Sequence, residues 1–224
     1  MKLKSILNYF GQLRLYSFLD LLVFSTALTR DINTISGIGL LWLSFLLYLE
    51  SRHNDNLRLR INTYLWLAPF IVSLFLVPIW TALGFVFVSY LYTKKKENGI
   101  CGISAPLWRG LQNGIIAAGF NFQLAILAFV LTFIRNLIGD FRDVNNDKER
   151  GGKTIPIVLG VKKNQAWSFY AHIFLVIATT IVWFNFSFLQ KSLIMPIILL
   201  QLISYPLTPR LSNPKYLNIY DNEK

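Results

Sequence analysis

Cysteine is almost absent from this chain of 224 residues, which contains only Cys101. An internal disulfide framework is therefore excluded. Histidine is also scarce. His53 and His172 are the only two, and they lie too far apart in sequence to form a metal-binding box. Charged residues make up 15% of the chain, against about 25% in soluble domains. We find no soluble domain, low-complexity segment or internal repeat, so secreted disulfide scaffolds and ordinary soluble enzymes are disfavoured.

Apolar residues dominate instead, with 54% hydrophobic and 15% aromatic side chains. They gather in runs that approach the roughly 20 residues needed to cross a bilayer. We therefore predict an all-α protein, a polytopic membrane bundle of about eight transmembrane helices that forms one domain over residues 1–224. Pro78 is expected to break the long apolar stretch around it into two spans, because proline lacks a backbone donor. The runs are Leu15 to Leu28, Ile32 to Leu49, Asn62 to Val77, Pro78 to Tyr92, Leu107 to Phe120, Phe122 to Gly139, Trp167 to Phe188 and Ile194 to Leu207.

The basic residues give these spans a direction, because cytoplasmic loops carry an excess of lysine and arginine. With eight spans and a cytoplasmic N-terminus, only Arg30 and Lys191 of the 22 basic residues fall on the far side. Both termini are then cytoplasmic, and we expect a retained first helix and not a cleaved signal peptide. The protein is expected to be an integral, multi-pass membrane protein, in the inner membrane if it is bacterial.

The net charge of +11 is explained by the same topology and by contact with anionic lipid head groups. Nucleic acid is not expected as a partner, because the basic residues are scattered over separate loops between apolar runs. Membrane lipids are the expected partners of this charge.

The stretch from Arg135 to Gly160 reads RNLIGDFRDVNNDKERGGKTIPIVLG, and in it an apolar run ends in a cluster of carboxylates. Four polar residues are spaced by four, three and four positions: Asn136, Asp140, Asp143 and Asp147. If the stretch is helical, all four fall within one stripe at roughly 100° per residue. Three acids on one face repel one another unless a cation lies among them. Mg²⁺ suits such a set, because it takes a few carboxylates and completes its shell with water and phosphate oxygens.

A second interpretation of these acids needs no metal. Arg142, Lys148 and Arg150 stand among them, and an acidic helix end with compensating surface pairs is a common and weakly stabilising arrangement. Spacing alone leaves both interpretations open.

The same stretch resembles the second aspartate-rich motif of the UbiA superfamily of intramembrane prenyltransferases, including the Gly, Thr, Pro and Leu-Gly that follow the acids. The family places two acidic motifs on cytoplasmic loops after its second and sixth helices, where the charge pattern puts the corresponding segments here. The resemblance implies that Asp140, Asp143 and Asp147 are catalytic and hold Mg²⁺ that bridges to an isoprenyl diphosphate. Asn136 stands where many members have an acid.

Other residues would contact the diphosphate if the resemblance holds. Arg150 and Lys153 are basic residues within the motif, and Tyr90 and Lys94 match a Tyr and a Lys four residues later that bind the substrate in some members. An aromatic belt residue and lysines of a cytoplasmic loop would give the same Tyr-x-x-x-Lys spacing.

The first aspartate-rich motif departs from the family pattern Asn-Asp-x-x-Asp-x-x-x-Asp. Asn54 and Asp55 match its start, whereas Arg58 and Asn62 stand where the later aspartates belong. An alignment one turn earlier offers Glu50, with Asn54 in the middle position. We expect Asn54, Asp55 and Arg58 to bind substrate, with Arg58 as a fixed counter-charge in place of a second metal ion.

The function implied is Mg²⁺-dependent transfer of an isoprenyl group from an allylic prenyl diphosphate to a hydrophobic acceptor in quinone or lipid biosynthesis. The acceptor would be an aromatic quinone precursor or a glycerol-type lipid alcohol. Trp108, Phe120 and Phe122 are candidates for an aromatic wall around the carbocation, or else packing and lipid-facing residues. Two alternatives are a non-catalytic family member that binds isoprenyl diphosphate or a partner, and a small transporter in which Asp20 lies within the membrane.

Overall fold

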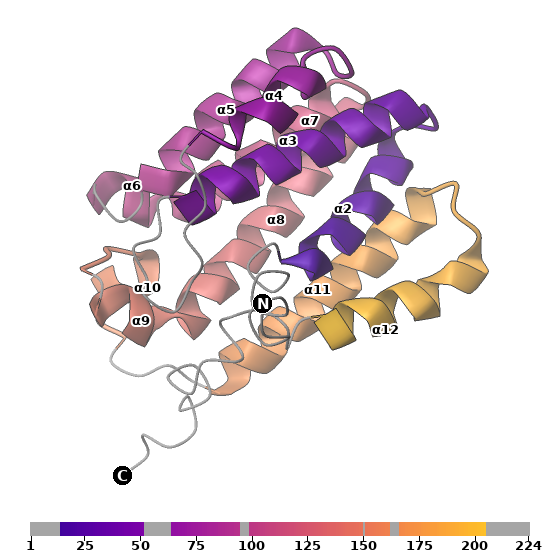
Figure 1. Cartoon of the computed structure of the whole chain (residues 1–224). Coiled ribbons are helices and arrows are strands. Elements are labelled where there is room, and N and C mark those ends of the chain that lie inside the picture. The colour runs from indigo at the N-terminus through magenta and orange to yellow at the C-terminus, as the bar shows by residue number, and fades with distance from the viewer. Residues whose placement is uncertain (1–13, 52–63, 95–98, 150, 162–165, 205–224) are drawn as a thin grey trace, which may run out of the picture. The chain divides into compact units, whose positions relative to one another are not determined.

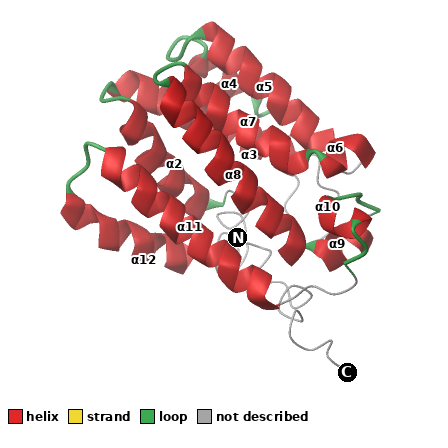
Figure 2. Ribbon diagram, turned by 180° about the vertical axis from the view of Figure 1, so that it is seen from behind, coloured by secondary structure: helices red, strands yellow, loops and turns green. Residues whose placement is uncertain are grey.

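The computed structural model describes residues 14–51, 64–94, 99–149, 151–161 and 166–204. Within these ranges the chain is helical and contains no strand (Figure 2), which confirms the all-α prediction there. The helices are α2 (Leu15–Leu28), α3 (Ile32–Ser51), α4 (Leu67–Ser73), α5 (Ile79–Thr93), α6 (Gly99–Ile103), α7 (Ala105–Ala118), α8 (Phe122–Arg142), α9 (Val144–Glu149), α10 (Ile155–Val158), α11 (Ala166–Phe186), the 3₁₀ turn η2 (Lys191–Leu193) and α12 (Ile194–Ser204).

Each predicted apolar run contains a helix, but not every helix is long enough to cross a bilayer. Among the described residues, three segments have the length and apolar character of a span: α3, α8 and residues 167–186 of α11. The apolar segments in α2, α5 and η2–α12 are shorter, and α4 has only seven residues. A membrane protein is thus indicated, while the count of eight spans and the orientation of the termini stay predictions.

Local signals in the sequence explain several helix boundaries. Pro78 is the N-cap of α5, as its missing donor predicts. Asn121 caps α8, because its side-chain oxygen accepts from the backbone N–H groups of Gln123 at 2.8 Å and Leu124 at 3.1 Å. Asp31 does the same for α3, with its carboxylate accepting from the N–H groups of the second and third helical residues. The connection from α7 to α8 is short, because α7 ends at Ala118 and α8 begins at Phe122.

The chain forms two compact units, one of Met1–Val77 with Thr180–Lys224 and one of Pro78–Thr179. In the first unit α2 packs against α3 and α12, and α3 packs against α4 (Figure 1). Gly37 permits a close approach of α3 to the turn that follows α4, because a Cβ there would lie 2.7 Å from the Leu76 side chain. A single domain over residues 1–224 stays a prediction.

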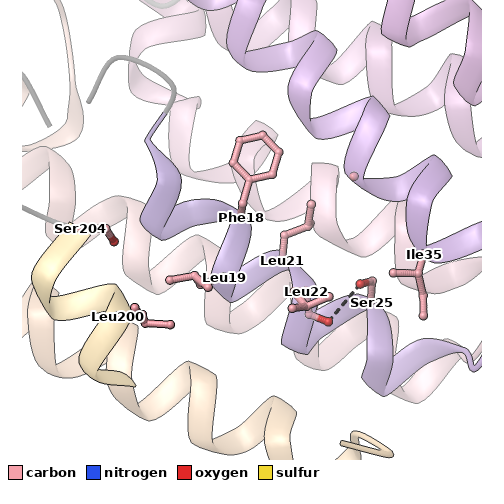
Figure 3. Close-up of a pocket in the computed structure, with 9 residues that line it drawn as sticks. Phe18, Leu19, Leu21, Leu22, Ser25, Ile35, Leu200 and Ser204 are labelled. Atoms are coloured by element: carbon pink, nitrogen blue, oxygen red, sulfur yellow. Dashed lines mark hydrogen bonds between the residues drawn. The ribbon is translucent and has the colours of Figure 1, made fainter. Parts of the chain in front are cut away.

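An apolar cavity of about 520 Å³ lies in the first unit. Figure 3 shows its walls, formed by Phe18, Leu19, Leu21, Leu22 and Ser25 of α2, Ile35 of α3, and Leu200 and Ser204 of α12; Gly39 also lines it. Its two hydroxyl groups hydrogen-bond to carbonyls of their own helices. The cavity therefore offers contacts to hydrocarbon and little to a polar group.

The second unit is built on α7, which packs against α8 and α5. Gly110 and Gly114 face Phe129 of α8, and a Cβ at Gly110 would lie 2.8 Å from the Phe129 carbonyl oxygen. Small residues four apart let two helix backbones approach closely in membrane proteins. Asn113 also donates to the Thr132 hydroxyl at 2.8 Å. Close packing and a polar bond together hold α8, whose far end carries the acidic motif.

Candidate functional site

The acidic motif lies where α8 gives way to α9 and α10 (Figure 1). Asn136 and Asp140 belong to α8, Asp143 is its C-cap with φ −96° and ψ 8°, and Asp147 belongs to α9. The expected single helical stripe is therefore interrupted at Asp143. Backbone bonds of the helical type still reach across the break, from the N–H of Asp143 to the Gly139 carbonyl at 3.0 Å and from the N–H of Asp147 to the Asp143 carbonyl at 2.9 Å.

An ion pair accompanies this break. Arg142 Nε and Nη2 donate to the two carboxylate oxygens of Asp143, each at 2.8 Å. Arg142 is buried and Asp143 is half-buried. The compensating pair that the sequence allows is therefore present, but it lies in the protein interior and not on a solvated surface. A forked pair of this kind fixes the Asp143 side chain.

Asp140 and Asp147 are buried as well, with 3% and 7% of their surface exposed. Aspartate is rarely buried to this extent unless its charge is compensated. An acidic helix end that is simply solvated does not describe these two residues. They are the strongest candidates for chemistry in the second unit.

The segment after α9 folds back onto Asp147 because of two glycines. Gly151 has φ +72°, which side chains rarely adopt. The N–H of Gly152 donates to the Asp147 carbonyl at 2.7 Å, and a Cβ at Gly152 would lie 2.9 Å from that oxygen. Pro156 then stands in the first turn of α10, which packs against α8 and α9. The Gly-Gly-Lys-Thr-Ile-Pro sequence thus forms a turn that places α10 against the helices of the acidic motif.

Oxygen atoms near these acids suit a hard cation. The side-chain oxygen of Asn136 is buried and has no hydrogen-bond partner among the described residues. Two buried carboxylates and an amide oxygen match Mg²⁺, which binds through one or two carboxylates and keeps water and phosphate oxygens in its shell. Within the described residues, however, no group of three or more His, Cys, Asp or Glu side chains is placed to hold a metal ion. A set of three aspartate ligands stays a prediction.

The Tyr90 and Lys94 pair lies at the end of α5. Lys94 is the C-cap of that helix, and its Nζ lies 5.4 Å from the centre of the Tyr90 ring. Tyr90 is 45% exposed. The spacing of four residues therefore brings the two side chains into a cation–π contact, and their role toward a substrate stays a prediction.

A buried polar network joins α5 and α7, and the sequence pattern did not predict it. Arg109 donates to the Gln112 side-chain oxygen at 2.5 Å, and Gln112 donates to the Ser89 hydroxyl at 2.6 Å. Gln112 has no exposed surface. The guanidinium carbon of Arg109 also lies 5.6 Å from the centre of the Tyr92 ring. Arg109 and Gln112 stand about one helical turn apart near the start of an apolar run. Polar residues in such a place are a sequence signal of contact with a neighbouring helix.

Other predicted residues are spread more widely. Lys153 is exposed on the turn beside Thr154. Phe122 is 74% exposed and begins α8, 18 residues before Asp140, which corresponds to about 27 Å of helix. Phe122 and its neighbour Phe120 therefore cannot flank the acidic motif, because the helix separates them from it. Trp108 lies on α7 and is half-buried.

The remaining predicted residues concern the first acidic motif. Asn54, Asp55 and Arg58, and also Arg150 of the second motif, lie outside the described residues. Glu50, the alternative start of the first motif, is 3% exposed at the end of α3 and pairs with Arg14, with 3.5 Å between Oε1 and Nη2. This pair belongs to the first unit.

Comparison with known proteins identifies relatives with one named activity. The chain is 32% identical over 81 residues to the digeranylgeranylglyceryl phosphate synthase of Methanosphaera stadtmanae, covering 34% of this chain and 30% of that protein. Enzymes of the same name from Thermococcus gammatolerans and Thermococcus sibiricus are 35% and 31% identical over 79 and 93 residues, covering 35% and 37% of this chain.

These alignments are partial, since they span 26% and 32% of the two Thermococcus proteins. No family model matches the chain, and no solved structure matches it. The named activity of the relatives agrees with the resemblance that the aspartate-rich motif carries. Over about a third of its length, this chain is therefore similar to enzymes named digeranylgeranylglyceryl phosphate synthase.

Proposed function

We propose that this protein is a membrane prenyltransferase that moves an isoprenyl group from an allylic prenyl diphosphate to a glycerol-type lipid alcohol. The observation that carries the proposal is the burial of Asp140 and Asp147 at the junction of α8 and α9, with the glycine turn folded back onto Asp147. The named activity of the relatives favours a glycerol-type acceptor over an aromatic quinone precursor. The apolar helices support an intramembrane location for both substrates.

The proposed reaction requires the site to stabilise diphosphate as a leaving group. The allylic C–O bond breaks, diphosphate departs with the electron pair, the acceptor oxygen bonds to the allylic carbon, and the hydroxyl proton is released. Bound Mg²⁺ would supply positive charge to the departing diphosphate. Asp140 and Asp147 would hold that ion with the amide oxygen of Asn136, because these are the buried oxygen donors of the motif.

The basic residues have a second task in the same step. Charge grows on the diphosphate as the C–O bond breaks, and fixed donors aimed at that charge lower the barrier. We assign this role to Lys94, which is held over Tyr90 at the end of α5, and to Lys153 on the glycine turn. Arg142 is less suited to it, because its guanidinium already forks onto Asp143.

The test is prenyl transfer by the purified protein. Labelled allylic prenyl diphosphates of several lengths, Mg²⁺ and either a glycerol-type lipid alcohol or an aromatic acceptor are supplied in detergent micelles. We expect an ether product only with the alcohol, and a loss of about a hundredfold or more for Asp140→Asn. Asp20→Asn on α2 is the matched control and should keep its rate within about threefold. A folded protein that forms no product with either acceptor contradicts the proposal.

A second candidate, a binder of isoprenyl diphosphate without turnover, is favoured by one observation. The aspartate-rich motifs offer fewer free carboxylates than the family pattern. Asp143 is paired with Arg142, and Arg58 stands where the pattern of the first motif has an aspartate. This candidate predicts Mg²⁺-dependent binding of the diphosphate with no release of product. The same assay separates the two, because only the enzyme consumes its donor.

A further inference from the structure

Thr154, at the start of α10, carries a hydroxyl group that is buried in the second unit. Only 1% of the residue is exposed, and its Oγ1 has no hydrogen-bond partner among the described residues. The residue occupies the N-cap position of α10, where a threonine hydroxyl normally accepts a bond from the helix backbone. No such capping bond is made. A buried hydroxyl without a partner costs free energy, so another role is needed to explain a hydroxyl at this position.

The position of Thr154 relates it to the acidic motif. It follows Gly152 by two residues, and the N–H of Gly152 is bonded to the Asp147 carbonyl at 2.7 Å. The helix that Thr154 begins packs against both α8 and α9 (Figure 1), which carry Asp140 and Asp147. The Thr154 carbonyl accepts from the N–H of Val158 at 3.0 Å, which anchors the backbone of this residue. Thr154 therefore lies on a hydrogen-bonded backbone at the start of a helix that packs against the two helices carrying the buried acids.

A hydroxyl donor has a clear use beside carboxylates that hold a cation. A diphosphate brought to such a site is repelled by the carboxylates wherever its oxygens do not touch the cation. A neutral O–H can donate to one of these oxygens without adding charge that would compete for the acids. Hydrogen bonds to a charged acceptor are also stronger than those between neutral groups.

We propose that the Thr154 hydroxyl donates a hydrogen bond to a phosphate oxygen of the bound prenyl diphosphate. Thr154 is then a substrate-binding residue of the second unit, held in place by the glycine turn and Pro156. This inference rests on the proposed function, because it assumes that a diphosphate binds at the acidic motif.

The experiment compares Thr154→Val, which keeps the shape and removes the hydroxyl, with Thr154→Ser, which keeps the hydroxyl. Binding of an allylic prenyl diphosphate and of inorganic pyrophosphate is measured by titration calorimetry with Mg²⁺, and the melting temperature is measured without ligand. We expect Thr154→Val to melt at or above the wild-type temperature and to bind both ligands about tenfold more weakly or worse. Thr154→Ser should bind within about threefold of wild type. Thr154→Ala is the second variant, with the same expected loss, should valine prevent folding.

The outcomes separate this inference from the proposed function. Wild-type protein that binds while Thr154→Val binds equally well overturns the inference and leaves a packing role for the residue. A weaker Thr154→Ser that matches Thr154→Val also overturns it, because the lost affinity then follows the methyl group and not the hydroxyl. Wild-type protein that binds neither ligand with Mg²⁺ overturns the proposed function, and the inference with it.

Discussion

Gly152→Ala tests how closely the glycine turn controls the acidic motif. The new Cβ would lie 2.9 Å from the Asp147 carbonyl oxygen, whereas ordinary contacts begin at 3.4 Å. The turn and Asp147 must therefore separate by about 0.5 Å, and the 2.7 Å hydrogen bond between them must lengthen. Crowding of this kind costs about 1–3 kcal/mol. Since a misplacement of 1 Å can cost about a hundredfold in rate, we expect Gly152→Ala to lower prenyl transfer about tenfold.

The assay measures transfer rate and Mg²⁺ dependence in the same preparation as the melting temperature. Gly160→Ala is the matched control, because Gly160 has φ +74° with open space around it, so that a methyl group strains its own backbone without touching the acids. We expect Gly160→Ala to lose stability but keep its rate per folded molecule. Equal rates per folded molecule for the two variants would refute the link between the turn and Asp147.

Three further predictions concern the fold. Gly37→Ala should destabilise the protein by about 1–3 kcal/mol relative to Gly39→Ala in chemical unfolding, because a Cβ at Gly37 meets a side-chain atom of the chain after α4 at 2.7 Å and one at Gly39 meets nothing within 4 Å. Asp31→Ala should lower the melting temperature at neutral pH. The side-chain hydrogen bond from Thr34 is the main cause that lowers the pKa of Asp31, so the difference should shrink as pH falls below about 3.9. Gln112→Leu should cost about 1–3 kcal/mol in unfolding free energy, because its buried partner on α5 loses its donor.

Much of the helical pattern could be predicted because its signals are local. Pro78 cannot continue a helix, and Asn121 offers a side-chain oxygen to a helix start, wherever either residue lies in the fold. The break at Asp143 was not predictable in this way, since a spacing of four, three and four is also compatible with one continuous helix. The break coincides with an ion pair between Arg142 and Asp143, and aspartate favours turns over helix interiors.

The candidate site was also predictable only in part. The identity of the acids is visible in the sequence, but a stripe of aspartates has the same spacing whether it is solvated or enclosed. Asp140 and Asp147 are buried where α10 packs against α8 and α9, and a tertiary contact of this kind cannot be read from the spacing of the acids. The burial of Thr154, which is 1% exposed, is likewise not visible in the sequence. Asn54, Asp55 and Arg58 lie outside the described residues, so their role as the second half of the site stays a prediction.

The most direct measurement of the central claim is the stoichiometry of diphosphate release against product formation. A doubly labelled allylic prenyl diphosphate and a glycerol-type lipid alcohol are incubated with the purified protein, with Mg²⁺ and then with EDTA. A prenyltransferase releases one diphosphate for each ether formed, and chelation stops both. Tight binding of the donor by folded protein, with neither diphosphate nor ether released, would contradict the account and leave a binding protein in its place.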